Sequence, residues 1–228
     1  MLRNIREILS LSASQYGWVM EPDAKDILRL AGIDVPLYRW VKTPDEALEF
    51  ARTQGYPLAM KIVSPQVLHK SDVGGVIVGI NTQEALLAGF EKMTHLTGFT
   101  GVLLEEMCQG IELIVGAKID FQFGPVCMLG IGGVSVEIYQ DTVIRMAPVE
   151  KKDVESMVAH LKAHSLLQGF RGTKPINMAA LSQLLITFSS LVTELSDAIE
   201  SIDLNPVICN EERCVAADAR IILPPTRS

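Results

Sequence analysis

Apolar and polar positions alternate along the chain in a way that predicts a mixed order of helices and strands. The first clear helix follows Thr43-Pro44-Asp45-Glu46, a capping box with proline at the first helical position, and it should end at Gly55. The short apolar run at 58–63 then predicts a buried strand. The same reasoning places strands at 76–80, 102–107, 111–119 and 143–146, and helices from about 83, over 151–163 and over 178–195.

This order of elements is that of an α+β protein. The character of the chain changes near residues 108–110, which predicts two lobes that meet at a hinge, residues 1–107 and residues 108–228. A chain of 228 residues with 48% hydrophobic content can bury the core that such a fold needs.

The strand at 58–63 contains Lys61, and a lone ammonium there is costly to desolvate unless an anion meets it. The loop that follows has the sequence HKSDVGGV. Its Gly74 and Gly75 can reach positive φ, so that consecutive N–H groups can turn toward an anion, and His69 can carry a phosphoryl group. Together these residues predict a nucleotide polyphosphate site. The alternatives are an ordinary turn with a surface histidine, and a lysine that reaches the edge of the sheet.

Two strand-like segments near the C-terminus are joined by the polar Asn210-Glu211-Glu212, and they predict a hairpin. A turn centred between its two glutamates places Asn205 opposite Asp218, with Asp203 on the same face. One carboxylate and one amide oxygen, with positions left for water and phosphate, are typical of a Mg²⁺ site for nucleotide chemistry. The alternative is that these residues serve the turn alone.

Composition argues against several classes of function. A formal net charge of −7 without a long basic stripe argues against general nucleic-acid binding, so small molecules or protein are the expected partners. No apolar run approaches the roughly 20 residues that span a bilayer. The first residues lack the apolar region of a signal peptide, so the cytoplasm is the expected location. The four cysteines show neither CxxC spacing nor a histidine framework, and we expect free thiols.

Nine short motifs occur in order along nearly the whole chain: Lys61-Ile62, the HKSDVGGV loop, 103–107, Gly110-Ile111-Glu112, 123–126, Gly132-Gly133-Val134, 145–148, Arg171-Gly172 and 203–206. In this order and spacing they resemble the β subunit of ADP-forming acyl-CoA synthetases. The chain is also similar to the ATP-grasp half of succinyl-CoA synthetases. Each motif alone is weak, but the ordered set is specific.

The resemblance implies an ATP-grasp fold in which two α+β lobes clamp a nucleotide. The reaction it implies is acyl-CoA + ADP + phosphate ⇌ acid + ATP + CoA, with Mg²⁺ and ATP or ADP bound to this chain. A separate α subunit would carry the CoA-binding domains and the primary phosphohistidine, in an α2β2 heterotetramer. His69 corresponds to a second phosphoryl carrier on the β chain.

The resemblance also assigns the nucleotide site. Lys61 matches the lysine that contacts phosphate, Glu105-Glu106-Met107 the adenine-side hinge, and Glu112 the ribose-side acid. Asn205 and Asp218 match the metal ligands, the pair that the hairpin already places together.

Three further residues qualify this assignment. Arg145 is a candidate phosphate contact, with an ion pair to one of the carboxylates as an equal alternative. Ser201 and Asn177 stand where acids are expected, which bears on the preference for substrate or partner rather than on the nucleotide site. The acyl group is not specified by the sequence.

Two other functions fit the same nucleotide site. One is a non-catalytic ATP-grasp regulatory module, and the presence of His69, Lys61, Asn205 and Asp218 argues against it. The other is a self-contained carboxylate–amine ligase, which would not need a histidine on the loop.

Overall fold

The computed structural model describes residues 1–133, 141–169 and 174–225. The chain forms two compact units, one made of Met1–Val35 with Gln109–Ser228 (unit 1) and one made of Pro36–Cys108 (unit 2). The expected division put residues 1–107 together, whereas here residues 1–35 belong with the C-terminal part. Two of the sequence motifs, Arg171-Gly172 and the last residue of Gly132-Gly133-Val134, lie outside the described residues.

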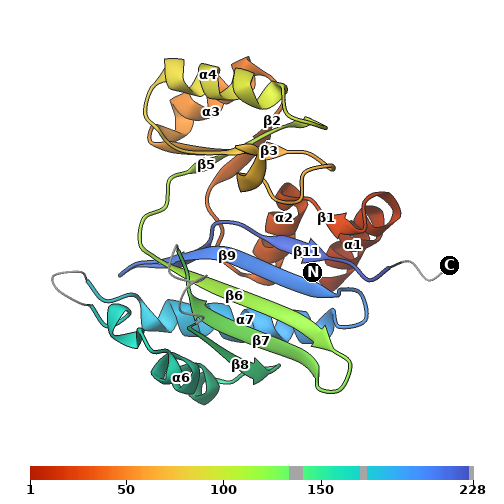
Figure 1. The fold of residues 1–228 in the computed structure, drawn as a ribbon, viewed down its shortest axis with the longest axis vertical. Helices are drawn as coiled ribbons and strands as arrows, with labels where there is room; N and C mark the ends of the chain where they lie inside the picture. The colour runs from red at the N-terminus through yellow and green to blue at the C-terminus, as the bar shows by residue number, and fades with distance from the viewer. Residues whose placement is uncertain (134–140, 170–173, 226–228) are drawn as a thin grey trace. The chain divides into compact units, whose positions relative to one another are not determined.

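Unit 2 is a four-stranded antiparallel sheet in the order β2-β5-β3-β4, packed against two helices (Figure 1). Alternate residues of β3, such as Met60 and Ile62, join the core with the helices, so Lys61 points to the opposite face. The elements of unit 2 are β2 (Tyr38–Val41), α3 (Pro44–Gln54), β3 (Leu58–Val63), the 3₁₀ turn η1 (Ser71–Val73), β4 (Val76–Ile80), α4 (Gln83–Thr94) and β5 (Gly101–Glu106).

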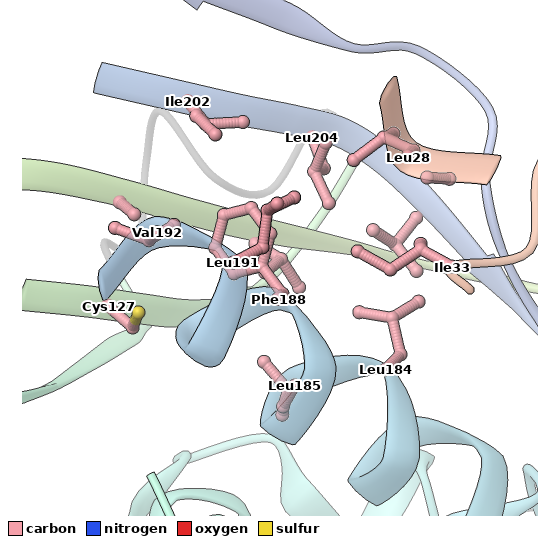
Figure 2. Close-up of a cluster of buried hydrophobic side chains, with 14 of the residues drawn as sticks. Leu28, Ile33, Cys127, Leu184, Leu185, Phe188, Leu191, Val192, Ile202 and Leu204 are labelled. Atoms are coloured by element: carbon pink, nitrogen blue, oxygen red, sulfur yellow. The ribbon is translucent and has the colours of Figure 1, made fainter. Parts of the chain in front are cut away.

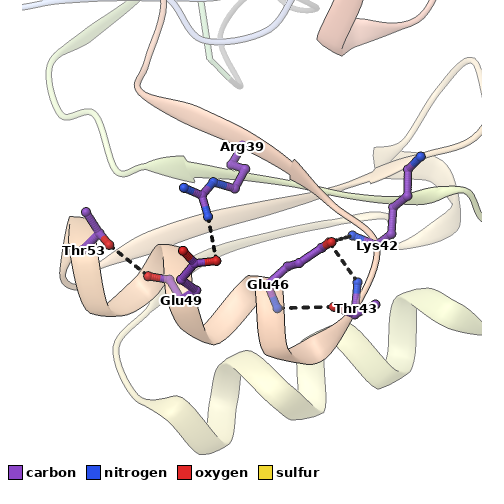
Figure 3. Close-up of polar contacts among 6 residues, drawn as sticks. All are labelled: Arg39, Lys42, Thr43, Glu46, Glu49 and Thr53. Carbon is purple, nitrogen blue, oxygen red and sulfur yellow. Dashed lines mark hydrogen bonds and ion pairs between the residues drawn. The ribbon is translucent and has the colours of Figure 1, made fainter.

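The predicted capping box opens α3, and it is confirmed. The Glu46 N–H donates to Thr43 Oγ1 at 3.3 Å, and the Thr43 N–H donates back to Glu46 Oε2 at 3.3 Å (Figure 3). The Lys42 N–H donates to the same carboxylate oxygen at 2.6 Å. The helix ends as expected before Gly55, whose φ is 80°.

Unit 1 contains a seven-stranded antiparallel sheet in the order β1-β11-β9-β6-β7-β8, with β10 also paired to β9. The second segment of the expected hairpin, residues 213–218, forms a strand only as β10, and β11 follows it outside that segment. The helix expected over 151–163 ends earlier, as α6. None of the described helices is long and apolar enough to cross a membrane. The elements of unit 1 are α1 (Leu2–Gln15), β1 (Trp18–Val19), α2 (Glu21–Ala31), β6 (Ile111–Asp120), β7 (Gly124–Ile131), β8 (Thr142–Met146), α6 (Lys151–His160), the 3₁₀ turn η2 (His164–Leu166), α7 (Met178–Glu194), β9 (Ser201–Cys209), β10 (Cys214–Ala216) and β11 (Arg220–Ile222).

One apolar cluster explains why the first 35 residues belong to unit 1. Phe188 and Leu184 of α7 lie in this cluster with Leu204 of β9, and Leu28 of α2 and the following Ile33 complete it (Figure 2). All five side chains are buried. Burial of large apolar side chains contributes roughly 1.5–3 kcal/mol each, so the N-terminal helices are held where their apolar sides are covered. Helical periodicity predicts such a side but does not identify its partner.

The capping box gives a test of local stability in unit 2. We expect Thr43→Ala to destabilise α3 by about 1 kcal/mol, because the Glu46 N–H loses its acceptor. Hydrogen–deuterium exchange of the α3 amides measures the change.

Thr53→Ala is the matched control on the same helix. The Thr53 hydroxyl donates to the Glu49 carbonyl inside the helix at 3.1 Å, a bond that does not support helix formation, so its loss should leave exchange unchanged or slower. Equal acceleration of exchange in both variants would contradict the role of the cap.

Candidate functional site

Lys61 forms an ion pair with a carboxylate of the protein itself. Its Nζ lies 3.1 Å from Glu105 Oε2, and the two side chains are only 8% and 2% exposed. Lys61 stands on β3 opposite Leu103, and Glu105 lies two residues further along β5, so both side chains share the sheet face away from α3 and α4. The burial of Lys61 requires an anion beside it, and the anion expected from the sequence was a phosphate. The structure shows that Glu105, expected at the adenine side, supplies a counter-charge.

The end of β5 is tied to the start of β2. The Glu106 N–H donates to the Leu37 carbonyl at 2.9 Å, and the Leu37 N–H donates to Glu106 Oε1 at 3.1 Å. Unit 2 ends two residues later, at Cys108, so Met107 lies at the expected hinge position. Glu106 therefore fixes the two ends of unit 2 beside each other.

The loop after β3 presents His69 at the surface, but its glycine amides are already used. The Gly74 N–H donates to the Ser71 carbonyl at 3.1 Å and the Gly75 N–H to the Lys70 carbonyl at 2.7 Å. We expected both amides to turn toward an anion, and in this structure they close the 3₁₀ turn instead.

The two glycines are required for other reasons. Gly74 has a φ of 66°, and a Cβ on Gly75 would come within 2.6 Å of Ile62 Cγ2. The pair therefore shapes the loop that carries His69 and packs it against β3.

Two aromatic residues on the sheet face of Lys61, one strand beyond β5, were missed in the sequence. Trp40 of β2 lies opposite Leu103, and Tyr38 lies opposite Glu105, which places both on the Lys61 face. Trp40 Nε1 is buried without a hydrogen-bond partner in the described part of the chain, and Lys42 Nζ lies 4.9 Å from the centroid of the Trp40 ring. The alternation of Tyr38, Arg39 and Trp40 was the signal that could have revealed them.

In unit 1, the predicted register of the C-terminal hairpin is confirmed on both sides of the expected metal pair. Cys214 lies opposite Cys209, Arg220 lies opposite Asp203, and the Ala217 N–H donates to the Pro206 carbonyl at 2.9 Å. The same register places Asp218 opposite Asn205. Asn205 is exposed and Asp218 is half-buried.

A β-bulge lies at this point of β9. On its other side, Leu113 of β6 is opposite Val207 and Val115 is opposite Leu204, so Asn205 and Pro206 together oppose a single residue. Because of the extra residue, Leu204 and Val207 both face the core although three positions separate them. Asn205 is left on the face away from the core, with Asp203.

An ion pair that sequence reasoning did not use flanks Asn205 and Asp218. Arg220 Nη2 lies 3.4 Å from Asp203 Oδ2. Gly116 of β6 stands opposite Asp203, and a Cβ at this glycine would lie 4.0 Å from Asp203 Oδ1. Arg220 follows Asp218 by two residues, and strand alternation was the signal that could have found it.

Glu112 lies on the sheet face that also carries Asp203 and Asn205, away from the core, which we call the open face of unit 1. On β6 it is two positions before Ile114 and four before Gly116, the residue opposite Asp203. The Gly132 N–H donates to the Glu112 carbonyl at 2.7 Å, and a Cβ on Gly132 would lie 2.8 Å from that carbonyl. A Cβ on Gly133 would lie 3.5 Å from Glu112 Oε2. Gly132 and Gly133 therefore pack directly over Glu112.

Arg145 does not lie with these residues. It stands opposite Cys127, whose side chain is buried in the core, so it is on the helix-covered face of the sheet. Its Nη2 donates to Ser156 Oγ of α6 at 3.0 Å and its Nη1 to the Ile144 carbonyl at 2.8 Å. The expectation of a phosphate contact is not supported, because the strand phase turns Arg145 away from Asp203 and Asn205.

The donor set of the open face fits a hard divalent cation. Asp203 has Arg220 beside it as a counter-charge, and the face also carries one further carboxylate, Asp218, and one amide oxygen, that of Asn205. Mg²⁺ is usually held by one or two protein oxygens, with water and phosphate completing the shell. No group of three or more His, Cys, Asp or Glu side chains that could hold a metal ion occurs among the described residues.

Comparison with known proteins shows the family to which this chain belongs. Residues 10–223 match the model of the ATP-grasp domain. The chain is 40% identical to the β subunit of the ADP-forming acetate–CoA ligase I of Pyrococcus furiosus, over 96% of this chain and 97% of that protein. It is 38% identical to the ADP-forming acetate–CoA ligase I of Archaeoglobus fulgidus, over 95% of this chain but only 33% of that longer protein.

A solved structure agrees with both comparisons. The dinucleotide-forming acetyl-coenzyme A synthetase 1 of Ca. Korarchaeum cryptofilum, in complex with coenzyme A and Mg-AMPPCP, superposes with a TM-score of 0.84 at 39% identity, covering 96% of this chain and all of the matched chain. Its phosphohistidine segment points towards the nucleotide-binding site. The chain described here belongs to the ATP-grasp family, among the β subunits of ADP-forming acyl-CoA synthetases.

Proposed function

We propose that this chain is the nucleotide-binding subunit of an ADP-forming acyl-CoA synthetase and transfers a phosphoryl group between a phosphohistidine and ADP. The observation that carries the proposal is the open face of unit 1, where the hairpin register sets Asn205 opposite Asp218 beside the Arg220–Asp203 pair. The net reaction is acyl-CoA + ADP + phosphate ⇌ acid + ATP + CoA.

The polar and charged residues have different proposed roles in phosphoryl transfer. Asn205 and Asp218 would hold Mg²⁺, which when bound neutralises negative charge on the nucleotide phosphates. Lys61 would contact phosphate through its ammonium, which carries three N–H donors and lies 3.1 Å from Glu105 Oε2. Glu105 is then a positioning residue that orients the buried ammonium.

His69 is the proposed phosphoryl carrier of this chain. It is exposed on a loop whose shape is fixed by Gly74 and Gly75, and a neutral imidazole nitrogen can attack phosphorus. In the direction of ATP synthesis, the N–P bond of the donor phosphohistidine breaks as the new N–P bond forms on His69, and the group then passes to the terminal oxygen of ADP, as the bond to His69 breaks in turn. The glycine amides do not take part in this proposal, because they close the turn.

The remaining parts of the enzyme are proposed to lie on a partner. The Pyrococcus relative is named as a β subunit, whereas the Archaeoglobus relative is a single chain about three times as long. We infer that an α chain supplies the CoA-binding domains and the primary phosphohistidine, in an α2β2 assembly. The acyl specificity would then be set outside this chain.

The metal pair is tested by Asp218→Asn, which keeps the side-chain shape and removes one charge. We expect Mg-ADP affinity to fall by about tenfold or more, because a charged ligand is worth roughly 1.5 kcal/mol or more. Isothermal titration of the purified chain with ADP, with and without Mg²⁺, measures it.

Glu211→Gln is the matched control, since it removes one carboxylate from the exposed turn of the same hairpin. The control should bind as the unchanged chain does. Unchanged Mg-ADP affinity in Asp218→Asn would refute the assignment of the ligand.

Variants of the buried Lys61–Glu105 pair in unit 2 distinguish a role in stability from a role in nucleotide binding. Glu105→Gln should lower stability by about 3 kcal/mol, because it removes the charge of the carboxylate that lies 3.1 Å from the buried Lys61 ammonium. Replacing both residues, Lys61→Met with Glu105→Met, should recover most of the stability, since a buried pair is often replaceable by apolar side chains. Urea denaturation measures this.

The double variant should nevertheless fail to bind nucleotide. If it bound ADP as tightly as the unchanged chain, Lys61 would be a structural residue alone.

His69→Asn tests the phosphoryl carrier. After incubation with ATP labelled at the γ-phosphate, the unchanged chain should hold an acid-labile, base-stable label that His69→Asn lacks, while both still bind nucleotide. The control is His95→Asn, which removes another exposed histidine of unit 2, at the end of α4. Equal labelling of all three proteins would show that His69 only supports the loop.

A further inference from the structure

Cys209 and Cys214 lie directly opposite each other where the β9–β10 hairpin turns. Both side chains are buried in the core of unit 1, on the side of the hairpin away from Asn205. Neither residue has a part in the nucleotide site described above.

The hydrogen-bond ladder puts this pair at a position suited to a disulfide. The Asn210 N–H donates to the Arg213 carbonyl at 3.0 Å, and the Ala217 N–H donates to the Pro206 carbonyl at 2.9 Å. Hydrogen-bonded and non-hydrogen-bonded pairs alternate along an antiparallel ladder, so Cys209 and Cys214 form a non-hydrogen-bonded pair. The Cα atoms of such pairs are about 4.5 Å apart, at the short end of the roughly 4.4–6.8 Å that disulfides span.

The two thiols already interact. A hydrogen bond with Cys214 raises the pKa of the Cys209 thiol, and burial raises it further. Cys214 Sγ also lies 3.9 Å from the carbonyl oxygen of Asn177, the residue that caps α7. Both sulfur atoms are therefore held at the base of the turn, facing each other.

The remaining cysteines lack this arrangement. Cys127 is also buried, and burial raises the pKa of its thiol to about 12, but the residues opposite it are Ala117 and Arg145. Cys108 is half-buried and lies at the end of unit 2. They provide internal controls for burial and for exposure.

We propose that Cys209 and Cys214 are a reversible oxidation site, at which a low-molecular-weight disulfide converts the dithiol into a cross-strand disulfide. One thiolate attacks a sulfur of the reagent RSSR, forming a mixed disulfide and releasing RS⁻. The second thiolate attacks the protein sulfur of the mixed disulfide and expels the second RS⁻. The two thiol protons end on the released thiolates, so two cysteines are oxidised and RSSR is reduced to two RSH.

The surroundings of the turn determine the rate. The Asn177 amide donates to the Glu212 carbonyl at 2.9 Å, and the Asn177 N–H donates to the Asn210 carbonyl at 2.7 Å. The reagent reaches the thiols when these contacts open. Only the thiolate attacks a disulfide, so oxidation accelerates as the pH rises, and the raised pKa of Cys209 keeps the reaction slow near neutral pH.

Peptide mapping of the full chain tests the site. Reduced protein is incubated with glutathione disulfide, alkylated and digested with trypsin, which cuts after Arg213, between the two cysteines. The disulfide would join peptide 172–213 to peptide 214–220. We expect this cross-linked pair to be the main oxidised product, to raise Tm by a few degrees because a short loop is closed, and to disappear with dithiothreitol.

Variants and controls make the outcome decisive. Cys209→Ala and Cys214→Ala should each abolish the cross-link and the shift in Tm, while Cys127→Ala and Cys108→Ala should retain both. If an alanine at 209 or 214 prevented folding, the peptide map of the unchanged chain would still decide. Glutathionylation of Cys108 without the 172–213 to 214–220 link, in protein that stays folded, would overturn the proposal.

Discussion

Strand β9 is paired on both sides, to β6 on one side and to β10 and β11 on the other, and the sheet of unit 1 depends on both pairings. It keeps them although it carries an extra residue at Asn205–Pro206. Against β6 that residue makes a bulge, whereas against β10 and β11 the register is the same before and after it. The segment between β10 and β11 therefore bulges with β9. Both strands bend at one point, and bulges of this kind re-aim side chains beside functional sites. The expected metal ligands lie at that bend.

A second constraint is the buried charge in unit 2. Lys61 and Glu105 come from neighbouring strands, and each is tolerated in the interior because the other is there. Unit 1 buries a similar pair within α2, where Lys25 Nζ lies 3.2 Å from Glu21 Oε1. The two pairs differ in their setting: Lys61 and Glu105 come from two strands of a sheet, on a face that also carries Tyr38 and Trp40, whereas Glu21 and Lys25 lie one turn apart on a helix.

Local signals in the sequence predicted local structure well. The capping box at Thr43, the strand around Lys61 and the register of the last hairpin follow from spacing and alternation within a few residues, and the structure agrees. Contacts between distant segments were not predictable in this way. The use of the Gly74 amides depends on a 3₁₀ turn, and the burial side of Arg145 depends on which strand face α6 covers.

The division of the chain has a consequence for the order in which it folds during synthesis. Unit 2 is one continuous stretch with its ends joined through Glu106 and Leu37, so it can fold as soon as it leaves the ribosome. Unit 1 cannot, because β1 pairs with β11 at the far end of the chain. Helices α1 and α2 are synthesised before the other elements of unit 1. Their apolar sides therefore stay uncovered until α7 and β9, which share their core, have been synthesised. The N-terminal segment is therefore where a nascent chain would most need a chaperone.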